Sequence, residues 1–233
     1  MNGSKVILAC LLALVFSTTQ ATADVVTPTN VTFSTEFAAA ANLINGSGLG
    51  PGDFKDKLHD NDENNMWQSW GDFEGSGTSI GAWVEFELDQ AYDLANAYIW
   101  QYNGLSIGPP IIDATWRETE DIDISVAPNL LDPLTSLGTT TLAAASALDP
   151  VNDPIPTLSE PVQIVGMGGV TAQRVRITIE TVYDQALATS IPDWFAGLSE
   201  VRFVEIPEPA TLGLAIGALS ISLGLMRRRR KRG

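Results

Sequence analysis

The sequence predicts an all-β protein whose single large domain is a β-sandwich of the jelly-roll type. Several short segments alternate apolar and polar residues with a period of two, which is the pattern of antiparallel strands with one buried face. The stretches between them are rich in Gly, Pro, Asn and Asp, and only Glu36–Leu43 has a helical pattern. Many short strands separated by turns, with almost no helix, fold as two packed sheets.

The first clear strand is Trp83–Asp89. Its apolar face consists of Val84, Phe86 and Leu88, and its other face is acidic, so we expect Glu85 to be exposed. Because the alternation is the same further along the chain, we predict three more strands of this kind. They are Asp121–Val126, Arg174–Glu180 and Glu200–Phe203.

Six segments follow one another in the order found in a discoidin domain, also called a coagulation factor 5/8 type C domain. They are His59–Ser69, Trp83–Leu88, Tyr98–Asn103, Glu120–Ser125, Gln173–Ile177 and Gly197–Phe203. The chain resembles this family over residues 58–204, and the resemblance implies a galactose-binding-like jelly roll that binds glycans, lipid head groups or proteins through its loop tips. It departs from the family at Asn61, where Gly is usual, and at Met66, where Thr is usual. The disulfide of many animal members is also missing.

The N-terminus has the parts of a secretory signal peptide. A single lysine precedes the apolar run Val6–Phe16, and Ala21 and Ala23 form a small-residue cleavage site. We therefore expect residues 1–23 to be removed, which leaves Asp24 as the first residue of the mature chain.

The C-terminus carries three features in succession. The tripeptide Pro207-Glu208-Pro209 precedes the uncharged apolar stretch 210–226, which is followed by the basic tail Arg227, Arg228, Arg229, Arg230, Lys231 and Arg232. A helix over the apolar stretch rises about 26 Å, at the short end of what crosses a bilayer. Because cations directly after a span oppose translocation, we predict a transmembrane helix whose basic tail stays in the cytoplasm.

This order of parts resembles the sorting signal of PEP-CTERM proteins, so we treat residues 207–233 as a sorting segment. The resemblance implies recognition and removal by a membrane transpeptidase of the exosortase type, in Gram-negative bacteria that make exopolysaccharide. The alternative is an ordinary membrane anchor, which needs only the apolar stretch and the cations. The tripeptide favours sorting, because an anchor has no use for rigid, helix-breaking residues at its outer edge.

The segment 24–206 has 183 residues, a size suited to one domain, and a net charge of −21 from six Lys or Arg and 27 Asp or Glu residues. Phosphate binding needs a basic surface, so this charge excludes nucleic acid as a partner. It is compatible with divalent cations and neutral sugars, although a dispersed acidic surface also serves solubility alone. The only cysteine, Cys10, lies in the predicted signal peptide, so the mature chain has no thiol chemistry.

The densest polar cluster is Asp60–Asn65. Calcium accepts six to eight carboxylate, amide and carbonyl oxygens, so Asp60 and Asp62 are candidate ligands of a structural calcium ion. No other cofactor is predicted. The alternative is that these Asp and Asn side chains form turns with their own backbone.

Catalytic residues are not predicted. His59 is the only histidine, and the mature chain has no second histidine or cysteine to complete a zinc site. Acidic pairs that could hydrolyse a glycoside are present, but the sequence distinguishes none of them. Of the six tryptophans, Trp116 and Trp194 lie in loop-like sequence and are candidates for stacking on a sugar, with core packing as the alternative.

The sequence as a whole predicts a non-catalytic protein exported through the inner membrane of a Gram-negative bacterium. Its precursor is anchored in the membrane and then reaches the cell surface or the extracellular biofilm matrix. The expected partner is exopolysaccharide or another glycan. The first alternative is a purely structural or adhesive matrix protein without a glycan site, and the second is a glycan-active enzyme.

Overall fold

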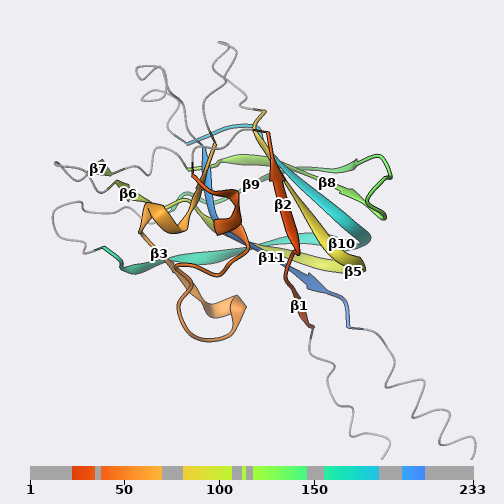
Figure 1. The fold of residues 1–233 in the computed structure, drawn as a ribbon, viewed down its shortest axis with the longest axis horizontal. Coiled ribbons are helices and arrows are strands. Elements are labelled where there is room, and N and C mark those ends of the chain that lie inside the picture. The colour runs from red at the N-terminus through yellow and green to blue at the C-terminus, as the bar shows by residue number, and fades with distance from the viewer. Residues whose placement is uncertain are drawn as a thin grey trace, which may run out of the picture. The chain divides into compact units, whose positions relative to one another are not determined.

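The computed structural model describes residues 23–34, 38–69, 81–106, 112–113, 118–145, 155–183 and 196–207. The chain divides into a compact unit, Val25–Glu205, and a second unit made of its two ends. The elements are β1 Val25–Val26, β2 Asn30–Phe33, η1 Ala40–Leu43, η2 Phe54–Asp56, β3 Leu58–Asp60, η3 Glu63–Asn65, β4 Trp67–Gln68, β5 Trp83–Gln101, β6 Leu105–Ser106, β7 Ile112–Asp113, β8 Asp121–Ala127, β9 Thr135–Thr141, β10 Leu158–Ile179 and β11 Gly197–Glu205. Within these ranges the only helices are three short 3₁₀ turns, so the all-β prediction is confirmed for them (Figure 1).

Nine strands form one sheet, with the order β1-β11-β5-β10-β8-β9 and with β2 beside β5, β3 beside β10 and β4 beside β11. Strands β5 and β10 are antiparallel partners along most of their length. At one end they pair with β2 and β8, and at the other end with β11 and β3. Their register shifts between Gly166 and Val170, where Gly168 and Gly169 have positive φ angles of 69° and 75°. Such a bulge increases the local twist of the sheet.

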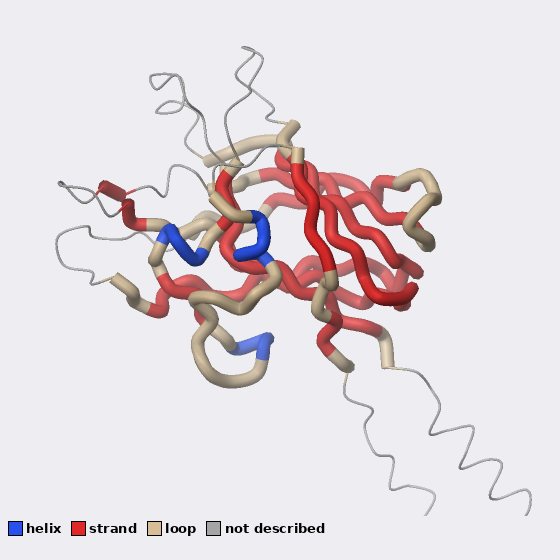
Figure 2. The backbone as a smooth tube through the Cα atoms, viewed as in Figure 1, coloured by secondary structure: helices blue, strands red, loops and turns tan. Residues whose placement is uncertain are grey.

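The two ends of this long strand pair share one hydrophobic core. Phe86 belongs to the part of β5 that pairs with β2, whereas Phe203 lies on β11, which pairs with the other part of β5. The two rings meet edge to face, with centroids 5.6 Å apart and an interplanar angle of 73°. The sheet therefore folds over on itself, and its two halves face each other as two layers (Figures 1 and 2).

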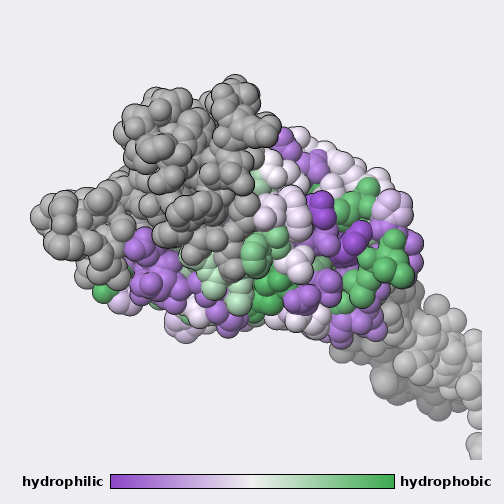
Figure 3. All heavy atoms as spheres, turned by 45° about the horizontal axis from the view of Figure 1, so that its top comes forward, coloured by the Kyte–Doolittle hydropathy of each residue, from purple (hydrophilic) through white to green (hydrophobic). Residues whose placement is uncertain are grey.

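The predicted inward faces of three strands are confirmed. The residues that the period of two assigns to the core are Val84, Phe86 and Leu88 on β5, Ile122, Ile124 and Val126 on β8, and Val175, Ile177 and Ile179 on β10, and all are buried. Burial of such side chains is the main favourable term in folding. Outside this core, hydrophobic residues on the described part of the surface occur in small groups among hydrophilic ones (Figure 3).

The prediction for β11 is wrong on one face. Glu200 and Arg202 alternate with core residues and should be exposed, yet both are buried. The reason is the segment Leu43–Lys57, which we call the covering segment, because it lies over the outer face of β11 and β5. The ring of Phe54 packs 6.4 Å from that of Trp100 and 5.7 Å from the guanidinium group of Arg202. The Trp100 indole N–H also donates to the carbonyl oxygen of Lys57, at 3.0 Å.

Glu85 also differs from the prediction, because it is buried on the outer face of β5. Its carboxylate lies 2.8 Å from Arg176 Nη2 and 3.7 Å from Arg174 Nε, both on the neighbouring strand β10. Arg176 in turn stacks over the ring of Trp83, 4.1 Å from its centroid. Two long arginine side chains therefore cover a carboxylate that faces away from the core.

The predicted helix Glu36–Leu43 is reduced to the 3₁₀ turn η1, Ala40–Leu43, and its first residues, up to residue 37, lie outside the described part. The turn has no side-chain hydrogen bond at its N-terminus, and Ile44 is the cap residue after its C-terminus. A short alanine run cannot by itself offset the cost of starting a helix, so packing decides the outcome. The buried side chains Ala40 and Leu43 fix η1 against β2, β4 and β11.

Most of the two ends lies outside the described residues. This holds for Ala21, Glu208, Pro209, the predicted transmembrane helix 210–226 and the tail 227–232, whereas Ala23 and Pro207 are described. Among the described residues, no helix has the length and hydropathy needed to cross a membrane. The signal peptide and the sorting segment therefore stay predictions from the sequence.

Candidate ligand-binding site

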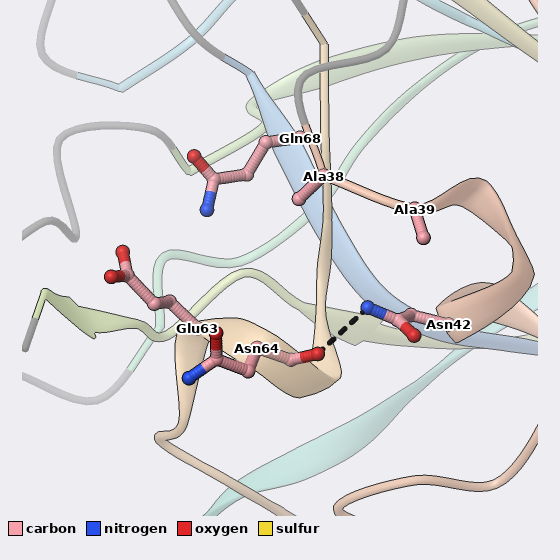
Figure 4. A pocket seen from close by; sticks show the side chains of 6 residues that line it. All are labelled: Ala38, Ala39, Asn42, Glu63, Asn64 and Gln68. Atoms are coloured by element: carbon pink, nitrogen blue, oxygen red, sulfur yellow. Dashed lines mark hydrogen bonds between the residues drawn. The ribbon is translucent and has the colours of Figure 1, made fainter.

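A polar hollow of about 370 Å³ lies between η1 and η3, and this volume falls in the usual range for ligand pockets. The described residues that line it are Ala38, Ala39, Asn42, Glu63, Asn64 and Gln68. Figure 4 shows the side chains of Glu63 and Gln68 extending to the same side of the hollow, with Asn42 on the opposite side. The described lining residues thus come from η1 and the two residues before it, from η3, and from the last residue of β4.

The rim formed by η1 is fixed by Asn42. Its Nδ2 group donates to the carbonyl oxygen of Asn64, at 2.9 Å (Figure 4), and to that of Met66, at 3.0 Å. These are backbone groups at the end of η3, which an amide side chain satisfies as a second backbone would. One side chain therefore holds the two rims at a set distance.

The rim formed by η3 is a hydrogen-bonded turn. The Asp62 carboxylate accepts from the backbone N–H of Asn64, at 3.0 Å, and from its side-chain amide, at 2.8 Å. Asp60 accepts from the backbone N–H of Asp62, at 3.2 Å, and from the side-chain amide of Asn65, at 3.0 Å. The polar cluster thus adopts the self-bonded turn that the sequence left open as an alternative.

Calcium at Asp60 and Asp62 stays a prediction. The two carboxylates and the neighbouring amides are oxygen donors of the type that calcium accepts, but both carboxylates already bind N–H groups. Among the described residues, no three His, Cys, Asp or Glu side chains come together as a metal site.

The base of the hollow is formed by Gln68 on β4, which is buried. Its side-chain amide donates to the hydroxyl oxygen of Tyr102, at 2.9 Å, and Tyr102 is itself fully buried. The backbone carbonyl of Gln68 accepts from the N–H of Ala38, at 3.2 Å, which ties the start of η1 to β4. Packing therefore fixes the orientation of Gln68 before any ligand arrives.

His59 does not line the hollow. It is fully buried on β3, where its Nδ1 atom lies 2.9 Å from the carbonyl oxygen of Asp60. Burial lowers the pKa of the imidazole, and the bond to Asp60 opposes this shift only in part. Gly48 approaches the ring so closely that a Cβ atom there would come within 2.5 Å of it. The histidine thus packs against the covering segment at Gly48.

The predicted stacking residues Trp116 and Trp194 lie outside the described residues. Trp67 and Trp100 are buried, whereas Trp83 is only partly buried. The sequence analysis did not find Asn42 or Gln68. Asn42 could have been noticed, because an asparagine after four alanines opposes the continuation of a helix.

The chemistry of the hollow is that of polar, mostly uncharged side chains among its described lining residues. The described lining residues supply amide donors and acceptors, one carboxylate and two alanine side chains, and none of them is a cation. Hydrolysis of a glycoside requires two carboxyl groups that flank the bond, whereas Glu63 is the single acid among these residues.

No protein-family model matches the sequence, and no curated protein matches it. Several solved structures are similar to the chain. One is a family 32 CBM from C. perfringens NanJ, solved in complex with galactose, at 13% identity and a TM-score of 0.43, with 76% of this chain and 93% of that chain covered. Another is the CBM32 of AlyQ in complex with 4,5-unsaturated mannuronic acid, at 14% identity and a TM-score of 0.46, with 77% and 97% covered.

A third similar structure is the F5/8 type C domain of a protein from Bacteroides fragilis, at 12% identity and a TM-score of 0.44. The match covers 80% of this chain and 98% of that chain.

Proposed function

We propose that this chain is an exported, non-catalytic protein that binds a neutral saccharide in the hollow between η1 and η3. The observation that carries the proposal is the set of amide groups around the hollow, with Gln68 fixed at its base by Tyr102. Amide and carboxylate groups in a prearranged ring suit the hydroxyl groups of a sugar, each of which donates and accepts. The galactose-binding-like jelly roll belongs to this proposal and agrees with the two-layered sheet.

Charge favours a neutral sugar over an acidic one. The segment 24–206 has a net charge of −21, and the described lining residues include Glu63 but no lysine or arginine. An anionic ligand needs a cationic partner when it leaves water. Neutral exopolysaccharide is therefore the proposed partner.

The proposed route to the cell surface rests on the two ends of the sequence. Ala21 and Ala23 support export across the inner membrane, and Pro207-Glu208-Pro209 supports sorting by an exosortase-type transpeptidase. We expect the native protein to begin at Asp24 and to end near Pro207–Pro209. Intact-mass analysis tests this expectation, and retention of the Arg-rich tail in the surface form would leave a plain anchor.

A glycan array probed with the full-length protein in detergent tests the binding proposal. We expect neutral hexoses such as galactose to bind and uronic acids not to bind. Glu63→Ala should weaken binding about tenfold, the effect of one hydrogen bond at the upper end of its usual worth. Asn42→Ala should also weaken binding, because it releases the carbonyl groups of Asn64 and Met66 and so loosens the rim formed by η3. The matched control is Glu87→Ala, which removes an equal charge on β5 and should bind like the parent protein. If no saccharide binds, or if the control is equally impaired, the hollow is not the site.

One observation favours the alternative of an adhesive protein without a glycan site. Leu131, in the turn between β8 and β9, is 97% exposed, and β9 is an exposed strand at the end of the sheet. Open strand edges and exposed apolar side chains are available to other chains. If no saccharide on the glycan array binds, sedimentation tests this alternative. Self-association of the parent protein that is lost in Leu131→Ser would support it.

A further inference from the structure

A buried ion pair lies beside the hollow without lining it. Glu200 and Arg202 both belong to β11, and their side chains are 0% and 4% exposed. Arg202 Nη1 pairs directly with Glu200 Oε1. Two charges removed from water are costly to a fold unless further hydrogen bonds satisfy their remaining donors and acceptors.

Those further hydrogen bonds go to the backbone at the end of η1. Arg202 donates to the carbonyl oxygens of Leu43, at 3.2 Å, and Ile44, at 2.8 Å. Glu200 Oε2 accepts from the backbone N–H of Gly46, at 3.2 Å. One ion pair on β11 thus binds three backbone groups within the first four residues of the covering segment.

The residue directly before these contacts is Asn42, which bonds to Asn64 and Met66 at the end of η3. Hydrogen bonds from β11 to the end of η1, and from Asn42 to the opposite rim of the hollow, are therefore joined by the backbone between Asn42 and Leu43. A shift of Leu43 or Ile44 away from Arg202 would move Asn42 with it, since they are covalent neighbours.

We propose that Glu200 and Arg202 are positioning residues of the hollow, which fix Asn42 through the backbone of Leu43–Gly46 and so set ligand affinity from outside the site. The proposal relies on the proposed function for its ligand but not for its geometry. It predicts that changing Glu200 alters the environment of Asn42 even when no ligand is present.

Ionisation of Glu200 provides a way to test this coupling. Burial raises the pKa of Glu200 to about 8. The charge of Arg202 on the same strand, and the Gly46 N–H and the charge of Lys57 on the covering segment, lower the pKa and so oppose this shift in part. Above this pKa the carboxylate is charged and holds Gly46 and Arg202 more strongly. Asn42 should then be best positioned, and affinity should rise with pH.

Stability should change in the opposite direction. Because the pKa of Glu200 is raised in the folded state above its ordinary value of 4.5, the folded state binds the proton more tightly than the unfolded state. The stabilisation is present at low pH and is lost as the pH rises through about 8. A merely structural role would make affinity fall together with stability, whereas a positioning role makes affinity rise while stability falls.

The experiment follows three NMR signals of the isotope-labelled full-length protein against pH, namely the Gly46 backbone amide and the side-chain amides of Asn42 and Asn64. We expect all three to shift with one midpoint near 8 in the parent protein, and to lose this transition in Glu200→Gln. The matched control is Glu85→Gln, another ion-paired carboxylate, which lies away from the covering segment and should leave the transition unchanged. The proposal is overturned if the Gly46 signal titrates while that of Asn42 does not, or if Glu200→Gln titrates like the parent.

A second measurement uses galactose as the probe, with its dissociation constant determined calorimetrically on both sides of the midpoint. We expect affinity to rise about tenfold across the transition in the parent and to be independent of pH in Glu200→Gln. Equal pH dependence in the two proteins overturns the proposal. Absence of galactose binding at every pH counts against the proposed function alone, because the amide titrations still decide whether Glu200 positions Asn42. If Glu200→Gln fails to fold, the titration of the parent and of the Glu85→Gln control decides.

Discussion

Two acidic residues on neighbouring strands, Glu85 on β5 and Glu200 on β11, occupy the same place in the same sequence pattern. Each alternates with core residues, and each is paired with arginine. Arg176, the partner of Glu85, has 31% of its side chain exposed, whereas Arg202, the partner of Glu200, has only 4% exposed. The first ion pair lies at the surface of the sheet, and the second lies beneath the covering segment.

Glu85 and Glu200 show that the face of a strand on which a residue lies and the exposure of that face to water are determined separately. A period of two determines which face of a strand a residue occupies. It does not determine whether that face meets water, since another part of the chain can lie over it. In this protein the covering segment turns the outer face of β11 into a second buried layer, and the charges of Glu200 and Arg202 bind backbone groups there instead of water.

The largest expected effect is on the inward face of the sheet, opposite to the face that carries Glu85 and Glu200. Val84→Asp, Ile124→Asp and Ile177→Asp should each unfold the domain, because each buries an unpaired charge at a cost of several kcal/mol. A domain of this kind has a total stability of about 5 to 15 kcal/mol. Circular dichroism during thermal unfolding measures the result.

The control for these variants is Thr178→Ala, on the outward face of β10, which should leave the thermal midpoint nearly unchanged. A midpoint for Ile177→Asp equal to that of the control would mean that the two faces are assigned incorrectly.

The second largest effect separates the two ion pairs. At a pH above 8, where the Glu200 carboxylate is charged in the parent protein, Arg202→Met leaves it buried without its partner and should cost about 3 to 5 kcal/mol of unfolding free energy. Arg176→Met removes a partly exposed partner of Glu85, which retains Arg174, and should cost about 1 kcal/mol or less. Urea unfolding of both variants measures the difference.

The double variant Glu200→Gln with Arg202→Met checks the reason given for this difference. If the cost comes from an unpaired buried charge, removal of that charge should restore much of the lost stability. No recovery would show that Arg202 contributes through packing on Phe54 rather than through its charge.

The third effect is a pH dependence of stability that Glu200 should produce. Between its ordinary pKa of 4.5 and the value of about 8 in the fold, Glu200 should make the unfolding free energy fall with rising pH. The slope contributed by one proton is at most about 1.4 kcal/mol per pH unit. Urea unfolding at a series of pH values should show this slope in the parent protein and in Glu85→Gln, and lose it in Glu200→Gln.

Much of the fold could be predicted from the sequence because short-range patterns determine it. Alternation placed Val84, Ile124 and Ile177 correctly, since each strand has one face in the core. The burial of Glu200 could not be predicted in the same way. It depends on contacts with Leu43 and Gly46, more than 150 residues earlier in the chain, and no local pattern records such a contact.

The candidate site was predicted only in part. The sequence drew attention to the polar cluster that contains Asp60 and Asp62, and this cluster does form one rim of the hollow through η3. The opposite rim was missed, because Asn42 acquires its role from bonds to Asn64 and Met66 across the hollow. A single asparagine has many possible roles, and the fold decides among them.

The smallest expected effect concerns a third carboxylate, that of Asp62, which is neither covered like Glu200 nor paired with arginine like Glu85. It accepts two hydrogen bonds from Asn64 and so caps η3. If capping is its only role, Asp62→Asn should be nearly neutral, because asparagine caps as well as aspartate, whereas Asp62→Ala should cost about 1 kcal/mol. Thermal melts of the two variants distinguish these results.

The same variants test the predicted calcium ion, because asparagine keeps the cap but removes the charge that would attract a cation. A ligand that binds only the folded state stabilises it by about 2.7 kcal/mol at a hundredfold excess over its dissociation constant. If Asp60 and Asp62 bind calcium, the parent protein should melt at a higher temperature in millimolar calcium than in chelator, and Asp60→Asn with Asp62→Asn should lose this difference. A parent protein that melts alike in both solutions would leave Asp62 with the capping role alone. The carboxylate of Asp62 would then serve to bind the backbone of the turn, just as the carboxylate of Glu200 binds the backbone of Gly46.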